Sequence, residues 1–144
     1  MNVETILRHK GATAVTIRPE TTIEAAVEIL RRCGIGALVV SGDGDSVDGL
    51  LAERDIIFGL ARHGAELLAM TAAEVMTQPA PTCEPEDSVQ TLMAEMTNRR
   101  IRHFPVVSEG RLTGIVSIGD LVKSRLDEIE FEAHSLRSFI AGAA

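Results

Sequence analysis

The sequence contains neither tryptophan nor tyrosine, and aromatic residues make up only 3% of its 144 positions. Single-stranded nucleic acids are commonly bound by stacking bases on aromatic side chains, so the scarcity of aromatics argues against such a platform. The formal net charge of −7 also argues against a general nucleic-acid binder, which needs a basic face for the phosphates. The core must be aliphatic, because hydrophobic residues still account for 45% of the chain.

Cysteines and long apolar runs are also scarce. The only two cysteines, Cys33 and Cys83, lie far apart and form no CxxC motif, which is typical of reduced thiols in the cytoplasm. No segment approaches the ~20 consecutive apolar residues that span a bilayer. The first ten residues carry Glu4, Arg8 and Lys10 and lack the apolar centre of a signal peptide. We therefore expect a cytoplasmic protein with no membrane partner.

Motifs for catalysis and metal binding are missing as well. The sequence has no GxSxG, Walker or GxGxxG motif, and its four histidines are not spaced as metal ligands. The acidic segment 43–48 is not an EF-hand, because Arg54 and Asp48 stand where the loop requires its glutamate and its glycine. That segment is better read as a polar hairpin turn. We expect no enzyme, no catalytic residue, no catalytic cofactor and no metal site.

What the sequence does have is an internal repeat. Pro19 and Pro85 are 66 positions apart, and similar residues surround them. Each is followed by a predicted helix with apolar residues at i, i+3, i+4 and i+7, which indicates one buried stripe per helix. The stripes consist of Ile23, Ala26, Val27 and Leu30 in the first copy, and of Val89, Leu92, Met93 and Met96 in the second.

The predicted ends of these two helices also correspond. Thr21 with Glu24, and Asp87 with Gln90, predict a capping box at each start. Gly34 and Asn98 are the expected stops.

Two strands follow each helix in the same order. Residues 37–40 and 104–107 are short apolar runs typical of buried strands, and each is followed by a polar turn. Residues 49–57 and 114–122 then predict a second strand that leads into another helix. Each unit therefore has the order β-α-β-β-α. Neither unit can bury its faces alone, so we predict an α/β fold of the α+β type in which two pseudo-symmetric repeats pack through their sheets.

The chain is expected to divide into four segments. They are a first repeat with an N-terminal lead-in (1–64), an ordered helical linker (65–76), a second repeat (77–125) and a C-terminal helix (126–144). The mixed composition of the linker argues against a flexible one.

The repeated motifs resemble a known family. Arg102-His103-Phe104-Pro105-Val106-Val107 and the segments 114–120 and 49–55 are similar to a tandem pair of CBS domains, named after cystathionine β-synthase, of the stand-alone bacterial type. The resemblance covers about residues 10–125. It implies a regulatory module that binds an adenosine-containing ligand such as AMP, ADP, ATP, NAD or S-adenosylmethionine and that forms a homodimer.

The main ligand site is expected at the junction between the last strand and the last helix. A carboxylate there suits the helix dipole and can accept two hydrogen bonds from a ribose diol, while free N–H groups and Gly119 admit a phosphate. The resemblance implies ribose binding by Asp120, pocket lining by Ser117, phosphate contacts from Arg102 and His103, and adenine held near Val15, Ile35 and Gly36.

Structural interpretations of the same residues remain open. Asp120 is also explained as a helix cap and residues 34–36 as a helix end. The densest cationic cluster of the chain is also explained as a solvated strand edge; it consists of Arg99, Arg100, Arg102 and His103.

A second, pseudo-symmetric site is expected around Asp55. Ala52 stands there in place of Ser117, and residues 35–36 replace the basic pair of the second copy. The remaining candidates for this site are a cation just before Asp55 and two threonines for the base, namely Arg54, Thr77 and Thr82. We therefore expect the Asp120 site to bind more tightly or to be the only one occupied.

The last predicted helix, about 120–140, extends past the second repeat. Its apolar residues alternate steps of four and three, as in a short coiled coil: Val122, Leu126, Ile129, Ala133, Leu136 and Ile140. The stripe either packs on its own domain or forms a dimer seam, and its position past the repeat favours the seam.

Two functional hypotheses follow. The first is a sensor that binds an adenine nucleotide between the repeats and signals through its dimer or a regulated protein partner. The second is a structural or interaction protein that has kept the fold without a nucleotide response.

Overall fold

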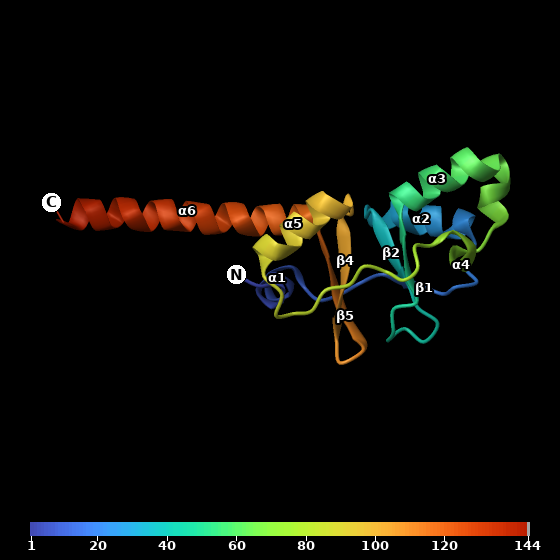
Figure 1. The fold of residues 1–144 in the computed structure, drawn as a ribbon, viewed down its shortest axis with the longest axis horizontal. Coiled ribbons are helices and arrows are strands. Elements are labelled where there is room, and N and C mark those ends of the chain that lie inside the picture. The colour runs from blue at the N-terminus through green and yellow to red at the C-terminus, as the bar shows by residue number, and fades with distance from the viewer. Residues whose placement is uncertain (144) are drawn as a thin grey trace.

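The computed structural model describes residues 1–143 as two packed repeats with one long helix projecting from them (Figure 1). The elements of the first repeat are β1 (Thr16–Ile17), α2 (Ile23–Cys33), β2 (Ala37–Val40), β3 (Gly49–Ala52) and α3 (Glu53–His63). Those of the second are α5 (Val89–Arg99), β4 (His103–Ser108), β5 (Arg111–Ser117) and α6 (Ile118–Ala143). The mixed α/β class and the repeat predicted from the sequence are confirmed.

Each repeat is built around a small sheet. In the first, β1 runs parallel to β2 with Ile17 beside Val40, and β3 is antiparallel to β2. In the second, β4 and β5 are antiparallel, and the strand corresponding to β1 is reduced to a single parallel bridge from Cys83 to Val106. The predicted β-α-β-β-α order therefore holds fully in the first repeat, whereas the first strand of the second repeat is only one residue long.

The helix caps lie one residue later than the sequence suggested. Thr22 caps α2 by accepting a hydrogen bond from the Ala25 N–H, and Ser88 caps α5 in the same way. The expected capping boxes at Thr21 and Asp87 are therefore wrong, although both helices begin where their apolar stripes predict. Gly34 ends α2 in the left-handed conformation at φ +64°, as expected.

The end of α5 also differs from the expectation. The helix continues past Asn98, and Arg100 caps it with a left-handed φ of +55°. The strain of this non-glycine residue costs about 1 kcal/mol. Its carbonyl oxygen accepts a hydrogen bond of 2.7 Å from Nη1 of Arg54 in α3, which links the two repeats.

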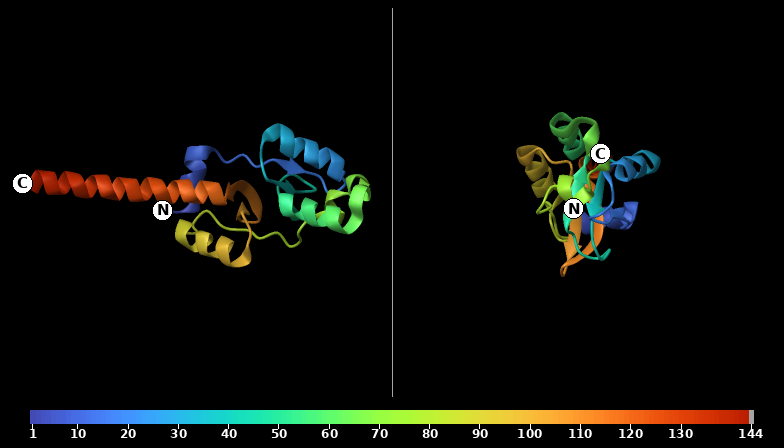
Figure 2. Two further views of the ribbon diagram at one scale, coloured as in Figure 1. Left: turned by 90° about the horizontal axis from the view of Figure 1, so that it is seen from above. Right: turned by 90° about the vertical axis from the view of Figure 1, so that its right-hand side faces the viewer.

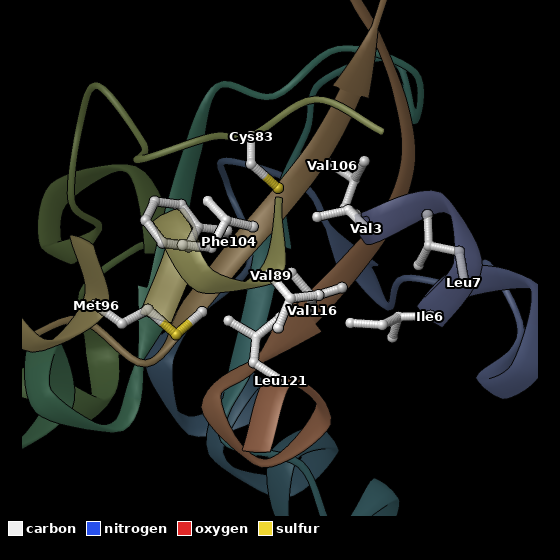
Figure 3. Close-up of a cluster of buried hydrophobic side chains, with 11 residues drawn as sticks. Val3, Ile6, Leu7, Cys83, Val89, Met96, Phe104, Val106, Val116 and Leu121 are labelled. Atoms are coloured by element: carbon white, nitrogen blue, oxygen red, sulfur yellow. The ribbon is translucent and has the colours of Figure 1, made fainter. Parts of the chain in front are cut away.

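An N-terminal helix, α1 (Val3–Lys10), was not foreseen. Asn2 caps it, and its buried side chains Val3, Ile6 and Leu7 join the core of the second repeat, not of the first (Figure 3). The glycine at position 114 of β5 makes room for this helix, because a Cβ there would lie 2.9 Å from Cδ2 of Leu7. The segment that leads into the first repeat in sequence therefore belongs to the second repeat in space.

The connection between the repeats is ordered by short helical turns, η1 (Gly64–Ala69) and α4 (Ala72–Val75). Leu67 and Ala72 are fully buried in the core of the first repeat. Backbone hydrogen bonds attach this segment to the start of α2: the Ile23 N–H donates to the Met70 carbonyl, and the Ala72 N–H donates to the Thr21 carbonyl.

A third cluster of apolar side chains joins the two sheets. Val39 and Leu50 of the first sheet are buried there against Leu112 and Ile115 of β5. This contact confirms that the repeats pack through their sheets, and it fixes the position of the cleft between them.

Helix α6 begins at Ile118, two residues before the expected start, and has 26 residues. At 1.5 Å per residue it is about 39 Å long. Its first turns pack against α5, with Leu121 fully buried, and the rest extends away from both repeats (Figure 1; Figure 2, left). Among residues 1–143, no helix has both the length and the apolar character that a membrane span requires.

Candidate ligand-binding site

A cavity of about 680 Å³ lies between the two repeats. Its walls come from the start of α3, the end of α5 and the beginning of β4, so both repeats contribute. Ligand pockets commonly measure about 300–1,000 Å³, so this cavity is large enough for a nucleotide. Apolar side chains form much of its wall: Leu50, Ile57, Phe58, Pro81, Met96, Ile101 and Ile118.

Positive charge is concentrated around this cavity. Arg54 reaches it from the first repeat, and Arg100, Arg102 and His103 reach it from the second. The chain as a whole carries a net charge of −7, so the cavity is a local exception. One guanidinium group can donate two parallel hydrogen bonds to the oxygens of a phosphate, so such a cluster is suited to an anionic ligand.

Gly36 leaves space where the repeats meet. A Cβ at this position would lie 2.6 Å from Oε1 of Glu53 and 3.2 Å from Cε1 of His103. Burial lowers the pKa of His103, as do Lys10 and Arg102, while Glu53 and Asp120 oppose this shift. The lowered pKa keeps the imidazole mostly neutral near pH 7.

Asp55 lies at the start of α3 and lines the same cavity. Its Oδ2 accepts a hydrogen bond from the Ala52 N–H at 2.8 Å, and its Oδ1 accepts one from Oγ1 of Thr77 at 2.7 Å. A carboxylate has about four lone-pair positions, so these two contacts leave capacity for a ribose diol. Thr77 itself is held by backbone hydrogen bonds to Leu50 in both directions.

Asp120 lies in the corresponding position at the start of α6. It forms a capping box with Ser117: the Ser117 N–H donates to Oδ2 at 2.9 Å, and the Asp120 N–H donates to the Ser117 hydroxyl at 3.2 Å. The ammonium group of Lys10 also donates to Oδ2 and to the Ile115 carbonyl. Burial alone would raise the pKa of Asp120, but the Lys10 and Ser117 contacts outweigh it and lower this pKa.

The two aspartates are related by the repeat. Each accepts a hydrogen bond from the segment that leads into the other repeat: Thr77 donates to Asp55, and Lys10 donates to Asp120. Thr77 and Gly11 are 66 positions apart, so Lys10 is adjacent to the position equivalent to Thr77. The repeat offset therefore contained a signal for Lys10 that the sequence interpretation did not use.

The predicted residues are grouped differently in space. Gly36, Arg102 and His103, expected at the Asp120 site, line the large cavity together with Arg54, Asp55 and Thr77. Asp120 instead lines a second cavity of about 470 Å³ with residues of α1 and α6. Arg100, a member of the cationic cluster recognised in the sequence, also lines the large cavity, as does Glu53, which the sequence interpretation missed.

Five further predicted residues line neither cavity, and one of them is Ser117, whose hydroxyl accepts a hydrogen bond from the Asp120 N–H. Val15 and Ile35 are half-buried against the core of the first repeat, and Thr82 is exposed. Gly119 is exposed in the first turn of α6, where a Cβ would lie 3.6 Å from the Ser117 hydroxyl. Within residues 1–143, no group of three or more histidine, cysteine or acidic side chains is arranged to hold a metal ion.

Comparisons with known proteins agree with this architecture. A family model for the CBS domain matches residues 10–62 and 72–127. The mitochondrial CBS domain-containing protein CBSX3 of Arabidopsis thaliana is 30% identical over 148 residues, covering 97% of this chain and 72% of that protein. Hypoxic response protein 1 of Mycobacterium tuberculosis is 33% identical over 102 residues, covering 71% of each.

Solved structures show the same arrangement. A CBS-domain-containing protein from Agrobacterium tumefaciens superimposes with a TM-score of 0.82 at 40% identity, covering 86% of this chain and 92% of that one. A CBS-domain protein from Burkholderia ambifaria, provisionally described as a signal-transduction protein, gives 0.82 at 37% identity, covering 88% and 95%. With two matched repeats and a long C-terminal helix, the chain belongs to the CBS-domain family, as a stand-alone tandem pair.

Proposed function

We propose that this protein is a regulatory module that binds an adenosine-containing ligand, AMP, ADP, ATP or NAD, in the cleft between its repeats. The observation that carries this proposal is the cavity of about 680 Å³, which Asp55 lines together with Arg54, Arg100, Arg102 and His103. The family membership supports a regulatory role without catalysis, and the provisional description of the Burkholderia relative points the same way.

The chemistry of the cavity fits the three parts of such a ligand. The arginine cluster suits phosphates, and Asp55 is positioned to accept hydrogen bonds from the ribose hydroxyls. Apolar walls such as Met96, Ile101 and Ile118 suit the flat face of adenine. We place the main site at Asp55, because Asp120 already binds Lys10 and faces a smaller cavity.

The test is a thermal-unfolding panel with adenosine, AMP, ADP, ATP and NAD at millimolar concentration. A ligand that binds only the folded state raises the transition temperature by mass action. We expect the phosphorylated ligands to stabilise the protein more than adenosine does, because adenosine cannot use the arginine cluster. Absence of stabilisation by every nucleotide would favour a structural or interaction protein and overturn the proposal.

Two matched variants distinguish the two aspartate sites. Asp55→Asn and Asp120→Asn each keep the size of the side chain and remove one carboxylate. We expect Asp55→Asn to abolish most of the nucleotide-dependent shift and Asp120→Asn to leave it largely intact. The reverse result would place the main site at Asp120 and refute our placement.

Signalling requires that the ligand bind two states of the protein with different affinities. We propose a homodimer as the signalling unit, with a regulated protein partner downstream and the cytoplasm as its compartment. A comparison of oligomeric mass with and without the stabilising nucleotide tests this part: a change in assembly or in partner binding is expected.

A further inference from the structure

The outer part of α6 carries large apolar side chains that nothing in the described chain covers. Leu126, Ile129, Leu136 and Ile140 are between 44% and 60% exposed, and the helix around them projects away from both repeats (Figure 1). The interpretation that this stripe packs on its own domain is therefore excluded for residues 126–140. A single projecting helix of this length is marginal in water, because helices are stabilised mainly by burying an apolar face.

The spacing of the stripe defines a heptad. Val122, Ile129 and Leu136 occupy d positions, and Leu126, Ala133 and Ile140 occupy a positions. This assignment places Phe131, which is 72% exposed, at an f position on the opposite side of the helix. A two-stranded coil would cover the a and d side chains and leave Phe131 in solvent.

The charges beside this seam determine the direction of a second helix. Arg125 and Glu132 occupy g positions, and Glu130 and Arg137 occupy e positions. In a parallel coil each g residue faces the e residue five positions later on the other helix. Arg125 then faces the second copy's Glu130, and Glu132 faces the second copy's Arg137, so all four contacts join opposite charges.

The antiparallel alternative is disfavoured by the same residues. There e faces e and g faces g, and the register that aligns the stripe around its centre brings Glu130 opposite the second copy's Glu130. The same register brings Glu132 opposite the second copy's Glu132. These like-charge contacts are unfavourable.

We propose that α6 beyond the second repeat forms a parallel, in-register, two-stranded coiled coil with a second copy of this chain. The seam consists of the a and d residues from Val122 to Ile140, and the two g–e pairs fix its direction and register. The seam residues 126–140 lie outside the large cavity, so this proposal can be tested separately from nucleotide binding.

The first test removes apolar contacts inside and outside the seam in the full-length protein. Leu136→Ser should raise the dimer dissociation constant by roughly 100-fold or more, measured by sedimentation equilibrium. Phe131→Ser is the matched control and should leave the constant unchanged. Both positions are exposed in the single chain, so neither substitution should disrupt the fold of the two repeats. A monomeric wild type, or equal effects of the two variants, would overturn the proposal.

The second test examines direction through charge. Glu132→Arg and Arg137→Glu should each weaken the dimer, because each creates two repulsive contacts across the seam. The double variant should restore wild-type affinity, since the two reversed charges face each other again on opposite helices. A contact between positions 132 and 137 of the same helix cannot explain such a restoration, because residues five positions apart on one helix do not face each other. Lack of rescue would contradict the parallel register.

A cross-link gives an independent readout of register. In a background with Cys33→Ser, Ala133→Cys places two thiols opposite each other at an a layer, where a disulfide can form. Ser138→Cys, at an f position, is the control and should remain unlinked. Efficient oxidation of the first variant alone supports the in-register coil, whereas equal cross-linking of both overturns it.

Discussion

The ammonium group of Lys10 lies 2.8 Å from Oδ2 of Asp120, although the two residues are 110 positions apart in the sequence. The pair ties the end of α1 to the start of α6, and both side chains are about one quarter to one third exposed. Lys10 therefore already bonds to the carboxylate for which the family resemblance implies a ribose contact.

Replacing Lys10 with methionine tests the role of this pair. Lys10→Met keeps the length of the stem and removes the charge, so the protein should lose about 1 kcal/mol of stability. The pKa of Asp120 should rise, since the lysine helps to lower it. Carbon-detected NMR titration of the carboxyl group measures this directly. Lys123→Met, another lysine beside the same cavity, is the control and should leave that pKa nearly unchanged.

Asp120 should also make the free energy of unfolding depend on pH in the acidic range. Its folded-state pKa is lowered, so its contribution is present above the unfolded pKa of about 4 and is lost as the pH falls through the folded value. The difference in unfolding free energy between wild type and Asp120→Asn should therefore shrink as the pH drops from about 5 to 3. Chemical unfolding at several pH values measures it; a constant difference would argue against the assignment.

His103 should make stability depend on pH in the same direction as Asp120, but at higher pH. Its folded-state pKa is lowered mainly by burial, so its contribution is present above the unfolded value of about 6.5 and is lost below it. If a phosphate binds beside it, nucleotide affinity should rise between pH 8 and 6, because the bound anion favours the protonated ring. Calorimetric titration with AMP over this range checks the slope, and His103→Gln should remove it.

Alanine substitutions at Gly36 and Gly114 should have different effects, because Gly36 lines the large cavity and Gly114 packs against α1. Gly36→Ala places a Cβ against the mobile end of Glu53, so we expect less than about 1 kcal/mol of destabilisation but weaker nucleotide binding. Gly114→Ala places a Cβ against Leu7 and the Ala12 carbonyl, so about 1–3 kcal/mol should be lost. Unfolding and binding measured together distinguish them, and similar stability losses would contradict this difference.

The N-terminal helix should contribute strongly to stability. Leu7 is buried in the core of the second repeat, so Leu7→Ala should cost about 2–5 kcal/mol. Leu68→Ala is the control, because that side chain is 41% exposed and should lose little. Denaturant unfolding of both variants gives the comparison, and equal losses would mean that α1 is only loosely attached.

Local pattern predicted most of the fold. Each such pattern can be recognised within a single element, as in the apolar stripes of α2 and α5 and in the strands around Val39 and Val106. The internal repeat then predicts each element in both halves of the chain. Cap positions shifted by one residue because Thr21 and Thr22 are adjacent and only the backbone angles decide between them. Helix α1 was not predicted, because its apolar face packs only against residues more than seventy positions away in the sequence.

The site was predicted less completely for the same reason. Asp55 and Asp120 have a recognisable local motif, but which cations reach each one depends on how two repeats are placed against each other. Arg102 and His103 line the cavity of Asp55, although their sequence neighbours suggested Asp120. Lys10 reaches Asp120 only because α1 packs on the opposite repeat from the one it precedes.

The exchange of α1 has a consequence for synthesis of the protein on the ribosome. The buried cluster under α2 in the first repeat uses a continuous stretch of chain up to Met76, so all of its side chains are available before the second repeat is made. The core of the second repeat needs both Val3 and Leu121, almost the first and among the last residues of the packed body. The apolar face of α1 must therefore wait, exposed, until translation is nearly finished, and early association with other chains is the specific risk of this topology.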